Sequence, residues 1–205
     1  MKLYTLPGAC SLASAIALRE AGIPFESVKV DKRTKQADGV DFRQINPKGS
    51  VPALQLDNGE VLTENVAVLT YIADLKPGSG LAPAAGSPER YRLAEWLGYI
   101  NSEVHKAFSP LFSPEASEEV KQYARKALNK QLDHLQSVLS GRQYLMGDRF
   151  TVADAYLFIV LGWGQHVGVD IGRWPALQAY RERIAARPSV QQTLEADRAR
   201  PKPAH

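Results

Sequence analysis

The order of the apolar patterns in the first part of the chain restricts its fold more than any other feature. Residues 1–5 form a short strand-like run, and residues 11–21 have the apolar spacing of a helix, with Gly22 as its C-terminal stop. Residues 25–30 then alternate as a strand does. A strand, a helix and a strand in this order predict a parallel strand pair joined by a right-handed crossover.

Two further runs extend this pattern into a complete small domain. Residues 51–56 and 60–63 read as strands, and the Asn58-Gly59 pair between them is a strong hairpin signal. A helix is expected from about Glu64 to Ala73, whereas the polar stretch 31–41 is expected to be irregular. The order β-α-β, loop, β-β-α is typical of a thioredoxin-like domain, which we place at residues 1–80.

The remainder of the chain has only helical patterns. Residues 76–86 are rich in Pro and Gly and form the expected linker, so an all-α domain is predicted over residues 87–205. The fold class is therefore α/β followed by all-α. Ser87-Pro88-Glu89 begins a long helix that is expected to end near Phe112. Further helices are expected over 117–141, from a capping-box-like Thr151–Asp154, over 175–187, and in a short last segment before a basic tail from Arg198.

Composition excludes several classes of protein. Hydrophobic residues make up 44% and charged residues 23% of the 205 residues, as in a globular chain. The net charge of +3 is small and scattered, so we expect no nucleic-acid partner. The longest apolar run, 155–169, is too short to span a bilayer and predicts a buried helix. With one cysteine and no signal-peptide pattern, the expected location is the cytoplasm.

The single cysteine, Cys10, is the first candidate for chemistry. It falls between the first predicted strand and the N-terminus of the first helix, where exposed N–H groups and the helix dipole stabilise an anion and lower the pKa of a thiol. A redox pair of the Cys-x-x-Cys type is absent, because the sequence reads Cys10-Ser11-Leu12-Ala13. The alternative is a buried, unreactive cysteine.

Two other segments have both a functional and a purely structural interpretation. Val51-Pro52 begins a predicted strand, where a cis bond would leave the backbone of Val51 able to pair with an extended peptide, while a trans proline at a strand edge is the alternative. Glu64 and Asn65 lie at a helix N-terminus. They either cap that helix or bind a ligand, with the Asn65 amide on a carboxylate and Glu64 on an ammonium.

A polar and aromatic stripe follows one face of the long predicted helix. Ser102, His105 and Lys106 have i, i+3, i+4 spacing, and Phe108 and Phe112 continue the stripe. Such a face suits a site for a polar and an apolar substrate side by side, or else it belongs to the core. Tyr156 and Trp163 on a later helix present the same choice. The dispersed histidines and the lone cysteine predict no metal site.

Several motifs together resemble the glutathione S-transferase family, and two of them resemble its bacterial beta class. The two beta-class segments are Pro7-Gly8-Ala9-Cys10-Ser11-Leu12 and Glu103-Val104-His105-Lys106. Supporting segments are Asn46-Pro47-Lys48-Gly49-Ser50-Val51-Pro52-Ala53-Leu54, Leu62-Thr63-Glu64-Asn65 and Gly147-Asp148-Arg149-Phe150-Thr151-Val152-Ala153-Asp154-Ala155. The resemblance runs over nearly the whole chain, and it implies a functional Cys10 and a cis Val51-Pro52 bond.

The resemblance also implies where glutathione binds as co-substrate. Its thiol would lie toward Cys10, its cysteinyl backbone would pair with Val51, and its γ-glutamyl end would reach Glu64 and Asn65. Lys35 matches a position that holds the glycyl carboxylate. The implied glutathione-binding residues are Cys10, Lys35, Val51, Pro52, Glu64, Asn65, Ser102, Glu103, His105 and Lys106, and the implied catalytic residues are Cys10, Ser11 and His105.

The second domain would complete the site in a homodimer. The resemblance implies that Ser102 and Glu103 reach glutathione across the dimer interface and that His105 lies near its sulfur. The family often has Asn where this chain has Gly98, which removes one polar contact to the tripeptide. The hydrophobic substrate would occupy a pocket formed by Phe108, Phe112, Tyr156 and Trp163.

Three functions follow from these residues. The first is transfer of glutathione to small hydrophobic electrophiles, and the second is thiol–disulfide or peroxide chemistry through a mixed disulfide at Cys10. The third is a non-catalytic role, in which the helical domain binds apolar ligands or a protein partner. Neither a metal nor a membrane is expected to take part.

Overall fold

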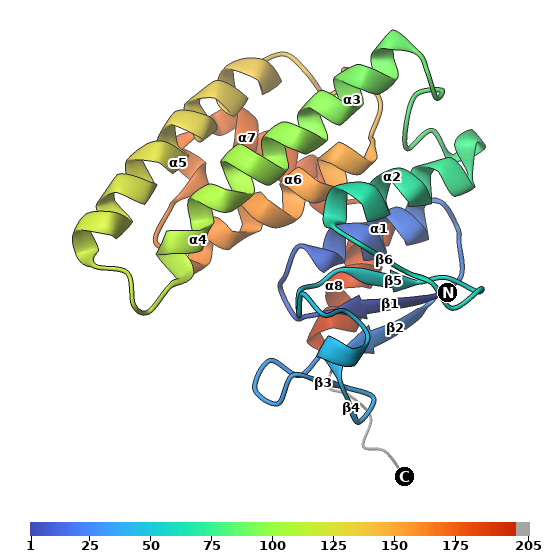
Figure 1. Cartoon of the computed structure of the whole chain (residues 1–205). Coiled ribbons are helices and arrows are strands. Elements are labelled where there is room, and N and C mark those ends of the chain that lie inside the picture. The colour runs from blue at the N-terminus through green and yellow to red at the C-terminus, as the bar shows by residue number, and fades with distance from the viewer. Residues whose placement is uncertain (200–205) are drawn as a thin grey trace. The chain divides into compact units, whose positions relative to one another are not determined.

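The computed structural model describes residues 1–199. They divide into two compact units, one formed by Met1–Ala82 together with the segment that begins at Ala186, and the other by Pro83–Ala185 (Figure 1). The first unit contains a sheet with helices, and the second contains only helices. The predicted fold class, a thioredoxin-like domain followed by a helical domain, is confirmed.

The sheet of the first unit has four strands in the order β2-β1-β5-β6 (Figure 1). β1 (Lys2–Thr5) pairs in parallel with β2 (Glu26–Lys29), as the strand–helix–strand pattern predicts. β5 (Ala53–Gln55) is antiparallel to β1 and to β6 (Val61–Thr63), which confirms the hairpin at Asn58-Gly59.

The stretch 31–41 is more regular than its polar sequence suggests. β3 (Gln36–Ala37) and β4 (Val40–Asp41) form a small antiparallel hairpin. Asp38 and Gly39 at its tip both have positive φ, a conformation that Asp and Gly tolerate better than other residues and that a tight hairpin turn requires. Ala37 belongs to a cluster of buried side chains that includes Tyr4 and Phe42, and this one apolar side chain holds the hairpin in place. The expectation of irregular backbone was therefore wrong.

Three helices complete the first unit: α1 (Ser11–Glu20), α2 (Asn65–Leu75) and α8 (Pro188–Arg198). The sequence analysis assigned α8 to the helical domain, but the structure places it against α1. The Glu20 carboxylate on α1 accepts two hydrogen bonds from the Arg187 guanidinium and one from Ser189. This polar anchor holds the last helix to the sheet-containing unit.

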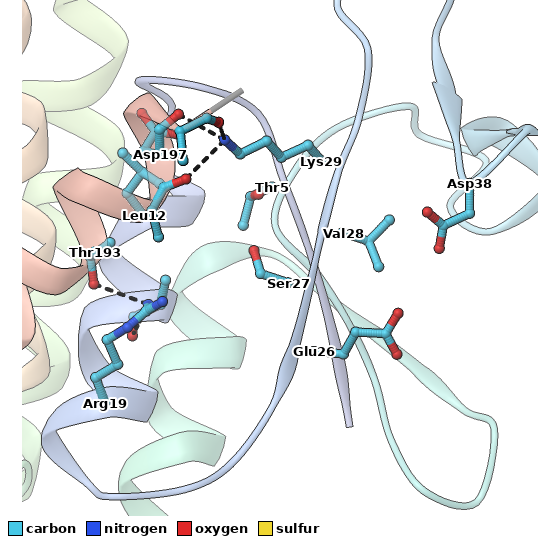
Figure 2. Close-up of a pocket in the computed structure, with 13 residues that line it drawn as sticks. Thr5, Leu12, Arg19, Glu26, Ser27, Val28, Lys29, Asp38, Thr193 and Asp197 are labelled. Carbon is cyan, nitrogen blue, oxygen red and sulfur yellow. Dashed lines mark hydrogen bonds between the residues drawn. The ribbon is translucent and has the colours of Figure 1, made fainter. Parts of the chain in front are cut away.

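A cavity of about 400 Å³ lies between β2, α1 and α8 (Figure 2). The Lys29 ammonium donates to the carbonyl groups of Ala196, Asp197 and Ala199, which uses all three of its protons. Arg19 donates to the Thr193 hydroxyl. Since protein oxygens engage both cations and no residue of the predicted site lines it, this cavity is separate from that site.

The second unit contains α3 (Pro88–Tyr99), α4 (Lys106–Phe112), α5 (Glu118–Leu139), α6 (Val152–Gly162) and α7 (Pro175–Ala185) (Figure 1). α6 confirms the buried helix for the first part of the apolar run 155–169, since every residue from Val152 to Leu161 is buried. The helix ends at Gly162, and a 3-10 helix at Trp163–His166 follows, so Trp163 is not on the same helix as Tyr156. Within residues 1–199, no helix is both long enough and apolar enough to cross a membrane.

Two local features shape the second unit. The predicted long helix is interrupted by a π-helix at Ile100–His105, so α3 and α4 are separate segments. The capping box before α6 is confirmed, because the buried Asp154 carboxylate accepts from the backbone N–H and the hydroxyl of Thr151. Asp154 also accepts from the Leu145 amide and from the Tyr180 hydroxyl. One buried carboxylate thus ties α6 to α7 and to the preceding loop.

Candidate active site

Cys10 lies at the N-terminus of α1, as its place in the sequence predicts. It is the N-cap residue, its side chain is 8% exposed, and its Sγ donates a hydrogen bond to the Val51 carbonyl at 3.5 Å. The Val51-Pro52 bond is cis, which confirms that expectation. The N-terminal turn of a helix carries a positive potential, so the site around Cys10 favours an anion.

Ser11 differs from Cys10 in its surroundings. It is fully buried, and its hydroxyl oxygen accepts from the Leu6 amide at 3.2 Å. This bond holds the turn between β1 and α1, and full burial does not favour the predicted contact between Ser11 and a ligand.

Glu64 lies at a strained position before α2. Its φ of +70° is unfavourable for a residue with a side chain. The side chain is exposed, and one carboxylate oxygen lies 2.6 Å from the Lys48 ammonium, which also donates to the Thr63 hydroxyl. Glu64 thus binds an ammonium group, which is the chemistry predicted for it, although the group belongs to the protein. Lys48 was not among the predicted site residues.

Asn65, the first residue of α2, is buried with an unused donor. Its Oδ1 accepts from the Ser14 hydroxyl at 2.9 Å, whereas its Nδ2 has no hydrogen-bond partner among residues 1–199. Leaving a buried polar group unsatisfied costs about 1–3 kcal/mol. A ligand oxygen that accepted from Nδ2 would remove this cost.

The remaining predicted glutathione contact in the first unit is Lys35. It is exposed, has a φ of +59°, and closes a turn in which its amide donates to the Asp31 carbonyl. Its ammonium therefore extends from a constrained turn.

In the second unit, His105 ends the π-helix and its ring is enclosed. Nδ1 lies 2.7 Å from the Tyr156 hydroxyl, which donates to Oδ1 of Asn101 at 3.1 Å. Burial, followed by the nearby Lys106 charge, lowers the pKa of His105 to about 4. The ring is therefore neutral at pH 7.

The predicted aromatic residues form one cluster around His105. The Trp163 ring lies 4.7 Å from the His105 ring and contacts both Phe108 and Phe112 edge-on. Tyr156 and Phe108 are fully buried, whereas Phe112 is 48% exposed. Trp163 is buried as well, so the cluster has three buried aromatic rings and one apolar side chain open to solvent.

The polar residues beside this cluster are on the surface. Ser102, Glu103 and Lys106 are exposed, and the Ser102 hydroxyl donates to the Glu103 carboxylate. A Cβ added at Gly98 would meet nothing within 4 Å. Among residues 1–199, no group of three or more His, Cys, Asp or Glu side chains is placed to hold a metal.

A thiol at the start of a helix, beside a cis-proline strand of a thioredoxin-like sheet, defines a class of proteins that bind and use thiols. Two family models match the chain within this class: the glutathione S-transferase N-terminal domain over residues 8–75 and the C-terminal domain over residues 99–188. The chain belongs to the glutathione S-transferase family.

Relatives of known identity support this assignment. Glutathione S-transferase GstA of Escherichia coli O157:H7 is 46% identical over 198 residues, which cover 96% of this chain and 98% of that protein. A sphingomonad glutathione S-transferase solved with glutathione is 52% identical, with a TM-score of 0.94, 96% of this chain covered and 98% of the other. A beta-class enzyme from Sphingomonas chungbukensis is 52% identical, with a TM-score of 0.93, 97% of this chain covered and 99% of the other. The resemblance to the bacterial beta class is confirmed, and the chain is a glutathione S-transferase.

Three features of the candidate site were missed by sequence reasoning. Lys48 lies in a quoted motif but is distant from Glu64 in sequence, so only the folded chain shows the pair. Ser14 partners Asn65 from another helix. Asn101, which is four residues before His105, could have been found from the same i, i+4 spacing that placed Ser102 and Lys106 on one face.

Proposed function

We propose that this protein transfers the thiolate of glutathione to small hydrophobic electrophiles. The observation that carries the proposal is the Cys10 thiol at the N-terminus of α1, within hydrogen-bond reach of the Val51 carbonyl. An anionic sulfur placed there gains both the helix N-terminal potential and an S–H donor. The glutathione bound in the 52% identical sphingomonad structure supports the choice of thiol.

The first unit supplies groups that fit the other parts of glutathione. The backbone of Val51 suits the cysteinyl peptide, and the Lys35 ammonium suits the glycyl carboxylate. Glu64 already binds one ammonium, that of Lys48, and would exchange it for the γ-glutamyl ammonium. The unused Asn65 Nδ2 would donate to the γ-glutamyl carboxylate. Pro52 keeps its predicted place beside the cysteinyl residue.

The proposal keeps the expected contribution of the second unit. Ser102 and Glu103 of a homodimer, together with His105 and Lys106, contact glutathione. Phe108, Phe112, Tyr156 and Trp163 form the wall of the electrophile pocket, with Phe112 as the exposed apolar surface and Tyr156 acting through its hydroxyl. The protein works in the cytoplasm, in detoxification.

The chemical task is to ionise the substrate thiol. A thiol with a pKa of about 8.5 is only about 3% ionised at pH 7, whereas a pKa of about 6.5 gives roughly three-quarters, a difference of about 2.7 kcal/mol. The thiol proton passes to water, the sulfur lone pair forms a bond to the electrophilic carbon, and the leaving group departs with its bonding electrons. Because His105 is neutral, the stabilising positive potential comes from α1 rather than from an imidazolium.

We propose a second activity because the side chain at the α1 N-terminus is a cysteine. A Cys10 thiolate attacks one sulfur of oxidised glutathione, a mixed disulfide forms, and one glutathione thiolate is released. Ser11 holds the turn that positions the Cys10 sulfur.

Two measurements test these activities separately. Retention on immobilised glutathione and turnover of an activated aryl halide are expected for conjugation. A wild-type protein that shows neither would overturn the proposed transferase activity. Intact mass after treatment with oxidised glutathione is expected to show one adduct at Cys10. The variant Cys10→Ala is the matched control, and an unmodified wild-type thiol would exclude the redox activity alone.

A further inference from the structure

We propose that Asn101, acting through Tyr156, is a positioning residue that fixes the tautomer of His105, so that the ring carries its proton on Nδ1 and presents Nε2 as a hydrogen-bond acceptor. The tautomer follows from the geometry of the second unit alone. Only its use in catalysis rests on the proposed function.

The three side chains form a continuous hydrogen-bonded chain. Asn101 and His105 lie four residues apart in the π-helix, and both reach the hydroxyl of Tyr156 on α6. Tyr156 is fully buried. π-helical turns are rare and often occur at functional sites, and this one places both residues against the same tyrosine.

The number of protons in this chain decides the tautomer. A tyrosine hydroxyl has one proton to donate, while its oxygen can also accept. The amide oxygen of Asn101 can only accept, so the hydroxyl proton points to Asn101 at 3.1 Å. The 2.7 Å contact to His105 must then be a donation from Nδ1–H to the hydroxyl oxygen. A neutral imidazole with its proton on Nδ1 has a lone pair on Nε2.

The surroundings hold the ring in this state. Trp163 packs edge-on at 4.7 Å and Tyr156 at 5.9 Å, so the ring is restrained on two sides. The lowered pKa keeps the second nitrogen unprotonated at pH 7. In catalysis, Nε2 accepts the hydrogen bond from the S–H of the substrate thiol and takes its proton as the thiolate forms. Because the pKa of His105 is about 4, the proton then passes to water. Nε2 does not donate to the thiolate, whose stabilisation is left to the first unit.

Nitrogen NMR of the full chain labelled with ¹⁵N-histidine measures the tautomer directly. His105→Gln assigns the His105 signal among the four histidines of the sequence. In the wild-type protein, Nδ1 is expected to give a protonated signal and Nε2 an unprotonated one at pH 7. The reverse pattern in the wild-type protein would overturn the proposal.

Variants of the outer residues test the positioning role. Asn101→Asp keeps an acceptor for the tyrosine proton and is expected to retain the Nδ1–H signal, whereas Asn101→Leu and Tyr156→Phe are expected to mix the two tautomers. We expect kcat for the aryl halide to fall about tenfold in Asn101→Leu, with recovery in Asn101→Asp. An unchanged tautomer in a folded Asn101→Leu would refute the role of Asn101. Absence of turnover with the expected tautomer would refute only the proposed function.

Discussion

The ammonium of Lys48 lies 2.6 Å from the carboxylate of Glu64, the residue with positive φ that precedes α2. The proposed glutathione contact uses the same carboxylate, so the ligand must displace Lys48. Lys48→Ala is therefore expected to lower the Kd for glutathione by about threefold, since an exposed ion pair is worth up to about 1 kcal/mol. Isothermal titration calorimetry measures this change.

Lys126→Ala is the matched control for Lys48→Ala, because Lys126 is an exposed lysine on α5 in the other unit. It removes the same charge and is expected to leave the Kd unchanged. Weaker binding in Lys48→Ala alone would show that Lys48 holds the ligand rather than competing with it.

The hydrogen bond from the Cys10 thiol predicts different effects on the two proposed activities. Cys10→Ala is expected to abolish the mixed disulfide and to raise the apparent pKa of bound glutathione, which absorbance of the thiolate measures. Cys10→Ser keeps a hydroxyl donor and is expected to lose the disulfide while retaining much of the ionisation. Equal pKa values of bound glutathione in all three proteins would contradict a role for Cys10 as donor.

The enclosed His105 predicts a pH-dependent stability. Its pKa is about 4 in the folded protein, because of burial and then the Lys106 charge, and about 6.5 when unfolded. The unfolded chain therefore binds more protons between these values. The free energy of unfolding has its full value above about pH 6.5. It falls as the pH drops toward 4, by up to about 3 kcal/mol.

Urea titrations from pH 8 to pH 4.5 measure this loss. In His105→Gln the part of the decline due to this residue is expected to vanish. The difference in free energy of unfolding between the wild-type protein and the variant therefore shrinks as the pH falls. Parallel curves over the whole range would show that the pKa of His105 is the same in the folded and the unfolded protein.

The Glu20–Arg187–Ser189 cluster predicts how α8 is held to α1. Burial alone raises the pKa of Glu20, but the hydrogen bonds from Arg187 and Ser189 outweigh it and hold the pKa below its usual value. Its contribution to stability is present above the unfolded pKa and is lost as the pH falls through the folded one. Glu20→Gln is expected to lower the free energy of unfolding by about 1–3 kcal/mol.

Chemical denaturation at pH 7 measures the effect of Glu20→Gln, and limited proteolysis reports early release of α8. Glu118→Gln is the control, since it removes an exposed ion pair with Arg125 and is expected to change stability by less than about 1 kcal/mol. Equal losses in the two variants would indicate that the Glu20 cluster is no stronger than a surface pair.

Open space around Gly98 predicts that the polar side chain common in the family can be restored. Gly98→Asn is expected to fold normally and to lower the KM for glutathione. Gly98→Ala separates the two effects, because alanine stabilises a helix by about 0.5–1 kcal/mol relative to glycine without adding a hydrogen bond. An equal KM in both variants would show that no contact is missing at this position.

Local sequence patterns predicted the features that neighbouring residues determine. Asn58-Gly59 predicted the β5–β6 hairpin, the helix-period segment after Cys10 predicted α1, and Thr151 with Asp154 predicted the capping box. The placement of Cys10 at a helix N-terminus followed from the same patterns. In each case the physical cause lies within a few residues of the feature.

Features that depend on distant partners were not predictable in this way. The interruption of the long helix at Ile100–His105 leaves the apolar spacing nearly intact, so periodicity alone does not show it. The partner of α8 is a carboxylate on α1, far away in sequence. The Asn65 amide looks like a simple cap until the fold buries it beside Ser14.

The position of α8 has a consequence for biosynthesis. The first unit is built from segments on both sides of the helical unit, so the ribosome completes the helical unit before it delivers α8 to the thioredoxin-like one. Domains usually mature in the order in which they are translated. Here the α1 surface that receives α8 must wait for the final segment, and a nascent chain stalled after Ala185 would display that surface to chaperones.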